Sequence, residues 1–388
     1  MKIDKQKIEN SFSKLGEDTK GHIDWIIFIP VVGLLLFSLV FVYSASAPIS
    51  AEKFEDVGTL FSKHLVRVFL GLITLIVFSK IDYHIYEKLA RPIFFVSIAM
   101  LVGVLIFGET INGAKRWLEI GPINFQPVEF AKFAMVIYFA YLLTQKQKVI
   151  KTFADGFFPF IIWTAIICLL IALQPNFSNL VLIFIIAMTM LFIGNANLLY
   201  LIPTVGVGGI FAVLYAVSAQ YRIDRIVSFF NLGDISPSVT GYQSQQALIA
   251  LGNGGVFGLG PGQGRQNHLF LPESYGDFIF SIIGEEYGFV GLVIIFIAFG
   301  VIFLRSMLVA KKAPDNFGYF LAIGIVITFA LYLVVNAAVN TGLVPTTGVP
   351  LPFISYGGTA ILIYSAVAGI LLNISAQANI YPLETNKK

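Results

Sequence analysis

One carboxylate stands where a long polar segment changes into an apolar run. Asp277 follows residues 271–276 and comes directly before the apolar residues 278–280. Partial burial at such a boundary raises the pKa of a carboxyl group toward the range useful for a general base, whereas the positive end of a following helix opposes that shift. Asp277 is therefore the first candidate for a catalytic base. The other interpretation is an N-terminal helix cap, a position that Asp favours.

Three further acids lie close to this candidate along the chain. With Glu273, Glu285 and Glu286, four carboxylates fall within fourteen residues. Carboxylates that converge can hold a divalent cation such as Mg²⁺ or Mn²⁺, so such an ion is a candidate cofactor, although no residue is assigned as a metal ligand. Glu285 and Glu286 are acids inside an apolar run, where a functional role is the default and structural pairing is the alternative.

Two pairs of charged residues lie earlier in the chain. Glu129 and Lys132 are three residues apart and hence neighbours on one helical face, which predicts a buried ion pair that holds helices in register or lines a cavity. Lys115 and Arg116 precede a tryptophan. They are either an interfacial anchor or a clamp for phosphate, which the fork of guanidinium donors suits.

The elements that must position these residues are membrane spans. The chain is 57% hydrophobic and 12% charged, and residues 156–221 and 316–383 contain no Asp, Glu, Lys, Arg or His. About 20 apolar residues cross a bilayer, and backbone groups in lipid must bond within the span. We therefore predict an all-α, polytopic transmembrane bundle. About ten spans are expected to begin near Trp25, His64, Pro92, Gln126, Phe157, Phe177, Leu198, Asp277, Asn316 and Phe353.

Lysine and arginine placement predicts the orientation of the bundle. Both terminal segments and the alternate loops on their side hold sixteen of the 25 basic residues, which indicates that both termini are cytoplasmic. The segments 1–24 and 375–388 are then cytoplasmic tails, and residues 25–374 form the transmembrane domain. The first apolar run is longer than a signal-peptide core, so a retained anchor is expected. The net charge of +3 follows from this orientation and does not indicate nucleic-acid binding.

Two breaks in the apolar pattern are expected to build a site. Residues 219–276 form a long extracytoplasmic loop with seven glycines between 252 and 264. These glycines match neither the dinucleotide nor the P-loop pattern, so they form an anion-binding nest or pack as a re-entrant segment against helices. The proline-rich residues 345–352, which lead to Ser355, cannot be regular helix and should be buried in protein or line a cavity.

Taken together, these segments resemble the SEDS family of shape, elongation, division and sporulation proteins, which includes RodA and FtsW. The resemblance covers residues 24–373, and its motifs occur in the family's order. They are Asn112-Gly113-Ala114 with Arg116-Trp117, Gln126-Pro127 with Glu129 and Lys132, Gln174-Pro175, Tyr242-Gln243, Leu271-Pro272-Glu273-Ser274 with Asp277, and Pro350-Leu351-Pro352-Phe353-Ile354-Ser355.

The resemblance implies a multi-pass protein of the inner (cytoplasmic) membrane that polymerises lipid II into glycan strands at the outer face and releases undecaprenyl pyrophosphate. In that family Asp277 matches the essential aspartate, and it would accept the proton of the acceptor hydroxyl. Arg116, Lys115 and a divalent cation would stabilise the anionic leaving group. Glu129, Lys132, Glu273 and Ser355 would belong to the substrate cavity.

Two segments, 283–286 and 342–348, resemble FtsW more than RodA. They imply a role in cell division, beside divisome proteins and a class B penicillin-binding protein that cross-links the glycan. The alternatives are a RodA-like role in elongation, a lipid II flippase, and a division scaffold without catalysis.

The sequence departs from the family pattern at four positions. Asn176 stands where Asp is common, Val128 where Ser is common, and Tyr275-Gly276 where His-Thr is usual. No charged role is expected at Asn176, and none of the departures removes the proposed base.

Overall fold

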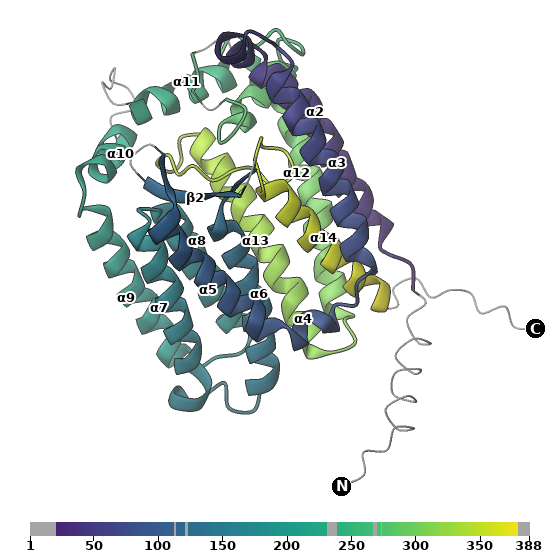
Figure 1. Ribbon diagram of the computed structural model, residues 1–388, viewed down its shortest axis with the longest axis vertical. Helices are drawn as coiled ribbons and strands as arrows, with labels where there is room; N and C mark the ends of the chain where they lie inside the picture. The colour runs from purple at the N-terminus through teal and green to yellow at the C-terminus, as the bar shows by residue number, and fades with distance from the viewer. Residues whose placement is uncertain are drawn as a thin grey trace, which may run out of the picture.

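The computed structural model describes residues 21–111, 114–120, 123–230, 239–266, 270–272 and 274–378. In these ranges, nine helices are long and apolar enough to cross a membrane. They are α2 (Trp25–Phe54), α3 (Thr59–Lys80), α5 (Ala90–Phe107), α6 (Pro127–Lys146), α7 (Phe158–Leu173) with the π-helical turn Phe153–Phe157 before it, α9 (Leu198–Ala216), α12 (Ile279–Lys311), α13 (Asn316–Asn340) and α14 (Ala360–Gln377). With the shorter apolar helix α8 (Phe177–Ile193), the predicted bundle of about ten spans is confirmed (Figure 1).

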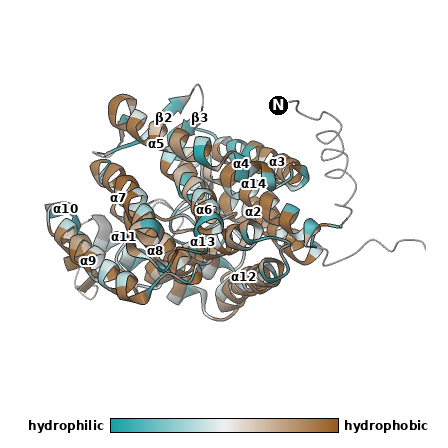
Figure 2. Cartoon of the chain, turned by 90° about the horizontal axis from the view of Figure 1, so that it is seen from below, coloured by the Kyte–Doolittle hydropathy of each residue, from teal (hydrophilic) through white to brown (hydrophobic). Residues whose placement is uncertain are grey.

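The bundle has a buried centre and a ring of outer helices. The most apolar window of α6 is 83% buried and that of α14 is 72% buried, whereas only 6% of the α9 window is buried. Outer helices such as α7, α9 and α12 are largely brown in the hydropathy colouring of Figure 2. Lipid tails are as apolar as these side chains, so an outer helix needs only a narrow face of protein contact.

Two spans begin elsewhere than the sequence predicted. The second span, α3, begins at Thr59 and not near His64. The last span, α14, begins at Ala360 and not near Phe353, because residues 341–359 contain no regular helix. Proline removes a backbone donor and clashes within a helix, and after Pro352 come Phe353 with a left-handed φ of 64° and two glycines, Gly357 and Gly358.

A small sheet lies at one end of the bundle, between α5 and α6 along the chain. The strands β1 (Glu109–Ile111), β2 (Ala114–Ile120) and β3 (Ile123–Phe125) are antiparallel in the order β1-β2-β3. Two of the strands have three residues each, which is too short for an alternating pattern to be recognised. In Figure 1 the sheet lies at the same end as α10 (Gln220–Phe230) and α11 (Val239–Gly254), two helices within the segment predicted as a long loop.

The glycine-rich residues after α11 pack against a break in α12. Gly288 has a φ of 66° and interrupts that helix. The Leu259 and Gly260 N–H groups donate to the Glu285 and Glu286 carbonyls at 3.0 and 2.9 Å, and Phe289 N donates to the carbonyl of Gly255 at 2.9 Å. Backbone groups on both sides therefore satisfy each other. The predicted packing of this segment against helices is confirmed by these contacts, and the backbone N–H groups of Gly262 and Gly264 donate to the Glu286 carboxylate of the protein itself.

The side chains of Glu285 and Glu286 also hold this segment. A Glu285 carboxylate oxygen accepts from the backbone N–H of Gln266 at 3.1 Å, and the other accepts from the Asn253 amide at 3.3 Å. Glu286 accepts from the hydroxyl of Ser44 on α2. Both acids are buried, so the structural alternative for these intramembrane carboxylates is the one that the contacts support.

The first and last spans meet at the end of the bundle away from the sheet. Asp24 caps α2 by accepting from Ile26 N at 2.9 Å, and its own N–H donates to Ser375 Oγ on α14 at 3.0 Å. Its carboxylate also pairs with Arg305 of α12 at 2.5 Å. The described chain thus begins and ends at the same end of the bundle, as an even number of spans requires.

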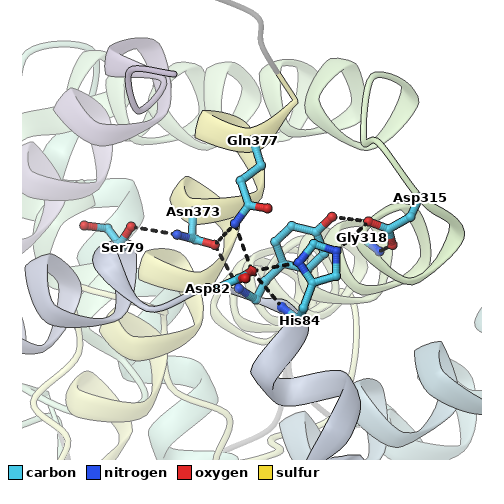
Figure 3. Close-up of polar contacts among 8 residues, drawn as sticks. Ser79, Asp82, His84, Asp315, Gly318, Asn373 and Gln377 are labelled. Atoms are coloured by element: carbon cyan, nitrogen blue, oxygen red, sulfur yellow. Dashed lines mark hydrogen bonds and ion pairs between the residues drawn. The ribbon is translucent and has the colours of Figure 1, made fainter. Parts of the chain in front are cut away.

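A polar network closes this end between α3, α13, α14 and the short helix α4 (His84–Lys88), as Figure 3 shows. His84 contacts Asp82 at 2.7 Å and Asp315 at 3.2 Å. Asp315 is the N-cap of α13 and accepts from Gly318 N at 2.8 Å. Asn373 and Gln377 connect the network to α14. It therefore joins three spans that are distant in the sequence.

We expect this network to make the stability of the fold fall as the pH becomes alkaline. The hydrogen bond to Asp315 raises the pKa of His84 from 6.5 to about 9. Burial alone would raise the pKa of Asp315, but hydrogen bonds from His84 and Tyr83 lower it from 3.8 to about 2. A raised histidine pKa stabilises the fold fully below pH 6.5, and the stabilisation is lost as the pH rises through about 9. The aspartate contribution is present above pH 3.8 and is lost only as the pH falls through about 2.

The measurement is the thermal unfolding midpoint of the purified protein as the pH rises from 6.5 through about 9, compared between wild type and His84→Gln. The midpoint should fall more in wild type. Both side chains are about a third exposed, at 37% and 33%, so the difference corresponds to about 1 kcal/mol at most. Equal pH dependence of the two proteins would contradict the expectation.

Candidate functional site

Asp277 lies just before α12, and its backbone is fixed from α13. The N-cap position of α12 belongs to Phe278, so Asp277 does not have the capping role that was its alternative. The backbone carbonyl of Asp277 accepts from the side-chain amides of Asn336 and Asn340, at 2.9 and 3.1 Å. Asn340 also accepts from the Ser281 hydroxyl at 2.7 Å. These contacts place the carboxylate at a defined point at the mouth of the bundle.

The sequence analysis did not identify these two asparagines as residues of the site. They are buried and lie four residues apart on a span without charged residues, so they face the same side of α13. Polar side chains within a span face protein or water and seldom lipid. That spacing was the available signal.

Ser355 supports the same point from the proline-rich segment. Its hydroxyl donates to the Gly276 carbonyl at 2.8 Å and accepts from Leu351 N at 2.7 Å. The neighbouring Tyr356 N donates to the carbonyl of Tyr275 at 2.9 Å. Ser355 is 3% exposed. Ser355 therefore holds the backbone of the residues before Asp277 in position.

Gly348, in the same segment, faces the Asp277 carboxylate. Its φ of 69° lies in the left-handed region, and a Cβ built on it would be 3.3 Å from Asp277 Oδ2. Only glycine adopts this conformation without cost and leaves room for the carboxylate.

We expect Gly348→Ala to lower activity at least about tenfold, since left-handed backbone costs an alanine about 1–2 kcal/mol and the methyl group crowds the carboxylate. The change should leave the protein folded. The measurements are the initial rate of the reaction proposed below and the thermal midpoint. The matched control is Gly33→Ala, because a Cβ there meets nothing within 4 Å. A wild-type rate in Gly348→Ala would show that the carboxylate does not need this space.

The predicted ion pair between Glu129 and Lys132 is confirmed in the centre of the bundle. Lys132 Nζ lies 2.7 Å from Glu129 Oε1, and both residues are buried. Lys132 also donates to Asn179 Oδ1 at 3.1 Å and lies over the Tyr332 ring, while Glu129 accepts from the Tyr364 hydroxyl at 2.8 Å. The pair thus connects α6 with α8, α13 and α14. This arrangement favours the role of holding helices in register.

Lys115 and Arg116 point to different surroundings, because successive side chains of a strand face opposite sides. Lys115 is exposed on β2. Arg116 reaches the turn before α8, where its Nε donates to the Gln174 carbonyl at 3.3 Å and its Nη2 donates to that of Pro175. Burial lowers the pKa of Arg116, and the charge of Arg225 adds to the shift. Of this sequence pair, Arg116 lines a cavity beside the start of α8, and Lys115 is not in the lining of that cavity.

That cavity has a volume of about 130 Å³ and lies between β2, α8, α10 and the proline-rich segment. Two arginines that the sequence analysis missed, Arg222 and Arg225, line it together with Asn176. They are three residues apart on α10, so they share one face of that helix. Treating residues 219–276 as a loop concealed this spacing.

The chemical roles predicted for the site residues stay predictions. Glu273 lies outside the described residues. In the described ranges, no group of three or more His, Cys, Asp or Glu side chains could hold a metal ion. The Mg²⁺ or Mn²⁺ ion stays a prediction, since such an ion is often held by one or two carboxylates together with substrate phosphates.

Comparison with known proteins finds similar sequences along almost the whole chain. The model of the cell cycle protein family of FtsW, RodA and SpoVE matches residues 24–380. A probable peptidoglycan glycosyltransferase FtsW of Trichlorobacter lovleyi is 40% identical over 93% of this chain and 95% of its own length. Stage V sporulation protein E of Bacillus subtilis is 36% identical, over 91% and 96% of the two chains.

Solved structures share the fold. A chain of a peptidoglycan synthase complex, studied for how it coordinates polymerization and crosslinking, superposes with a TM-score of 0.74 at 24% identity, covering 92% of this chain and 99% of that one. The rod shape determining protein RodA of Thermus thermophilus gives 0.67 at 23% identity, covering 91% and 96%. The motifs, the ten-helix frame and these matches agree, and the chain is a member of the SEDS family, the cell cycle proteins of the FtsW, RodA and SpoVE type.

Proposed function

We propose that the chain is a peptidoglycan glycosyltransferase that polymerises lipid II at the outer face of the cytoplasmic membrane during cell division. The observation that carries this proposal is the set of groups that surround Asp277. Two asparagine amides fix its backbone, Gly348 leaves space at its carboxylate, and an arginine-lined cavity lies nearby. Relatives named as FtsW support the division role.

The geometry supports transfer of a glycan by displacement at the anomeric carbon, where one bond forms as another breaks. The hydroxyl oxygen of the acceptor sugar attacks the anomeric carbon of the donor, and its proton passes to the Asp277 carboxylate. The bond between that carbon and the diphosphate oxygen breaks, so undecaprenyl diphosphate leaves with the bonding electrons. A general base contributes about 10²–10⁴ to such a rate. No step is assigned to a metal ion.

Further parts of the proposal concern placement and partners. The sheet and α10 face the outside of the cell, and both termini lie in the cytoplasm, as the basic residues of the loops predict. The partner is a class B penicillin-binding protein that cross-links the new strands, within the group of division proteins. The likeness to a chain of a peptidoglycan synthase complex supports this pairing.

The test is a polymerisation assay with fluorescent lipid II, using the purified protein alone and with its transpeptidase partner. We expect glycan strands of many disaccharides on a gel. A parallel assay in vesicles follows movement of labelled lipid II between leaflets. Movement of lipid II without polymer would establish the flippase function instead. If neither polymer nor movement is detected, the division scaffold is the alternative that remains. Parallel reactions with Mg²⁺, with Mn²⁺ and with a chelator measure whether the substrate brings a divalent cation.

A further inference from the structure

The cavity beside β2 is lined by an unusual concentration of positive charge. Its lining includes Arg116 from the sheet, Arg222 and Arg225 from α10, Asn176 from the start of α8, and Thr346 and Thr347 from the proline-rich segment. Within the described ranges, none of the three arginines forms an ion pair with a carboxylate. Three cations thus share one small cavity whose lining contains no acidic residue.

The contacts that hold the arginines orient them without neutralising them. Arg116 donates to two backbone carbonyls, and Arg225 Nη1 donates to the Thr346 carbonyl at 3.4 Å. The guanidinium of Arg222 lies 3.7 Å from the centre of the Tyr215 ring. Burial lowers the pKa of Arg116 and of Arg225. Mutual repulsion and burial both cost free energy, which a bound anion would recover.

Several donors at this cavity have no partner. The Nε and Nη1 atoms of Arg222, the amide nitrogen of Asn176 and the hydroxyls of Thr346 and Thr347 are buried and make no hydrogen bond. Each buried donor without an acceptor costs about 1–3 kcal/mol. Asn176 is held in this orientation because its oxygen accepts from the Asn179 amide at 3.0 Å. The missing complement is a group with several acceptor oxygens and negative charge.

The cavity is also linked to the proposed base. Thr346 and Thr347 directly precede Gly348, whose Cα faces the Asp277 carboxylate. The charge of Asp277 acts on Arg225 and partly offsets the effect of burial on its pKa. An anion in the cavity would therefore lie beside the reacting centre.

We infer that this cavity is a diphosphate-binding site in which Arg116, Arg222 and Arg225 hold the diphosphate of the polyprenyl-linked donor; the inference rests on the proposed function. A diphosphate that links a lipid to a sugar carries two negative charges. When the bond to the sugar breaks, the leaving oxygen gains a further charge. Three fixed cations match the leaving group better than the intact donor, so they stabilise the transition state more than the bound substrate.

The experiment measures binding of undecaprenyl diphosphate, undecaprenyl monophosphate and undecaprenol to the full chain in detergent. We expect Arg222→Gln and Arg225→Gln each to weaken diphosphate binding at least about tenfold, the loss of one or two charged hydrogen bonds. Monophosphate binding should weaken less, and undecaprenol binding should not change. Arg222→Lys keeps the charge and should lose less than Arg222→Gln. The matched control, Arg91→Gln, removes an exposed cation that lies over the Tyr141 ring on α6 and should bind as wild type does.

The outcomes separate the site from the function. Equal loss for both phosphates would overturn the diphosphate assignment, and unchanged diphosphate affinity in both glutamine variants would overturn the site. If the arginines bind diphosphate but the wild type makes no glycan, the proposed function fails and the site stands. Thermal midpoints identify any misfolded variant. If a glutamine variant is misfolded, the kinetics of Arg222→Lys decide. The inference requires the kcat of Arg222→Lys to fall by a larger factor than its KM rises, and a change in KM alone would oppose the inference.

Discussion

Asp277→Asn should reduce glycan polymerisation by about 10³-fold while the protein remains folded. Asparagine has nearly the same shape, but its amide cannot accept the proton of the attacking hydroxyl, and general bases contribute about 10²–10⁴. The bonds from Asn336 and Asn340 go to the backbone carbonyl of residue 277, so they persist in the variant. The measurement is the initial rate with fluorescent lipid II in the presence of the transpeptidase partner.

A matched control tests an Asp to Asn change away from the base. Asp56 is exposed and accepts from the Thr59 hydroxyl at 2.7 Å in the turn between α2 and α3, so Asp56→Asn should polymerise at the wild-type rate. Binding of undecaprenyl diphosphate should persist in Asp277→Asn, because the arginines are intact. Polymerisation by Asp277→Asn at more than a tenth of the wild-type rate would remove Asp277 from the mechanism.

The parts of the site that the sequence predicted are those whose signal is local. Asp277 was recognised because its polarity contrasts with the run that follows it, and the Glu129–Lys132 pair because residues three apart share a helix face. Their chemical roles needed tertiary contacts. Only the fold brings the amides of Asn336 and Asn340 to the carbonyl of residue 277, and no local pattern encodes that contact.

The residues that the sequence analysis missed depend on secondary structure inside a segment taken as a loop. Arg222 and Arg225 share a face only because residues 220–230 are helical. Lys115 and Arg116 separate only because residues 114–120 are a strand. In a membrane protein the apolar pattern is dominated by lipid exposure, so short elements at the surface leave a weaker trace than the spans.

The departure at Asn176 has a physical meaning in this fold. Its oxygen accepts from Asn179, which in turn accepts from Lys132 and from the Tyr332 hydroxyl at 3.2 Å. A neutral amide at this position leaves Glu129 as the acid that neutralises Lys132. It also presents a donor to the arginine-lined cavity, where a carboxylate would compete with a bound anion. The departure therefore agrees with the anion site.

The second large effect concerns stability. We expect Lys132→Met and Glu129→Gln each to lower the free energy of unfolding by about 3 kcal/mol, because each leaves one buried charge without its partner. Lys132 is fully buried, with no exposed side-chain surface. The double variant Glu129→Gln with Lys132→Met should be less destabilised than the two single changes added together, since it removes both charges. The measurement is unfolding of the purified protein in detergent, followed by temperature and by denaturant.

Exchanging the two residues tests whether the charge pair alone is required. The other contacts are not symmetrical: Asn179 offers an acceptor oxygen to Lys132, and the face of the Tyr332 ring attracts a cation. A glutamate at position 132 would meet an acceptor and the negative face of a ring, so Glu129→Lys with Lys132→Glu should recover only part of the lost stability. Full recovery would mean that pairing alone matters. No coupling between the single changes would mean that the pair does not hold α6, α8, α13 and α14 in register.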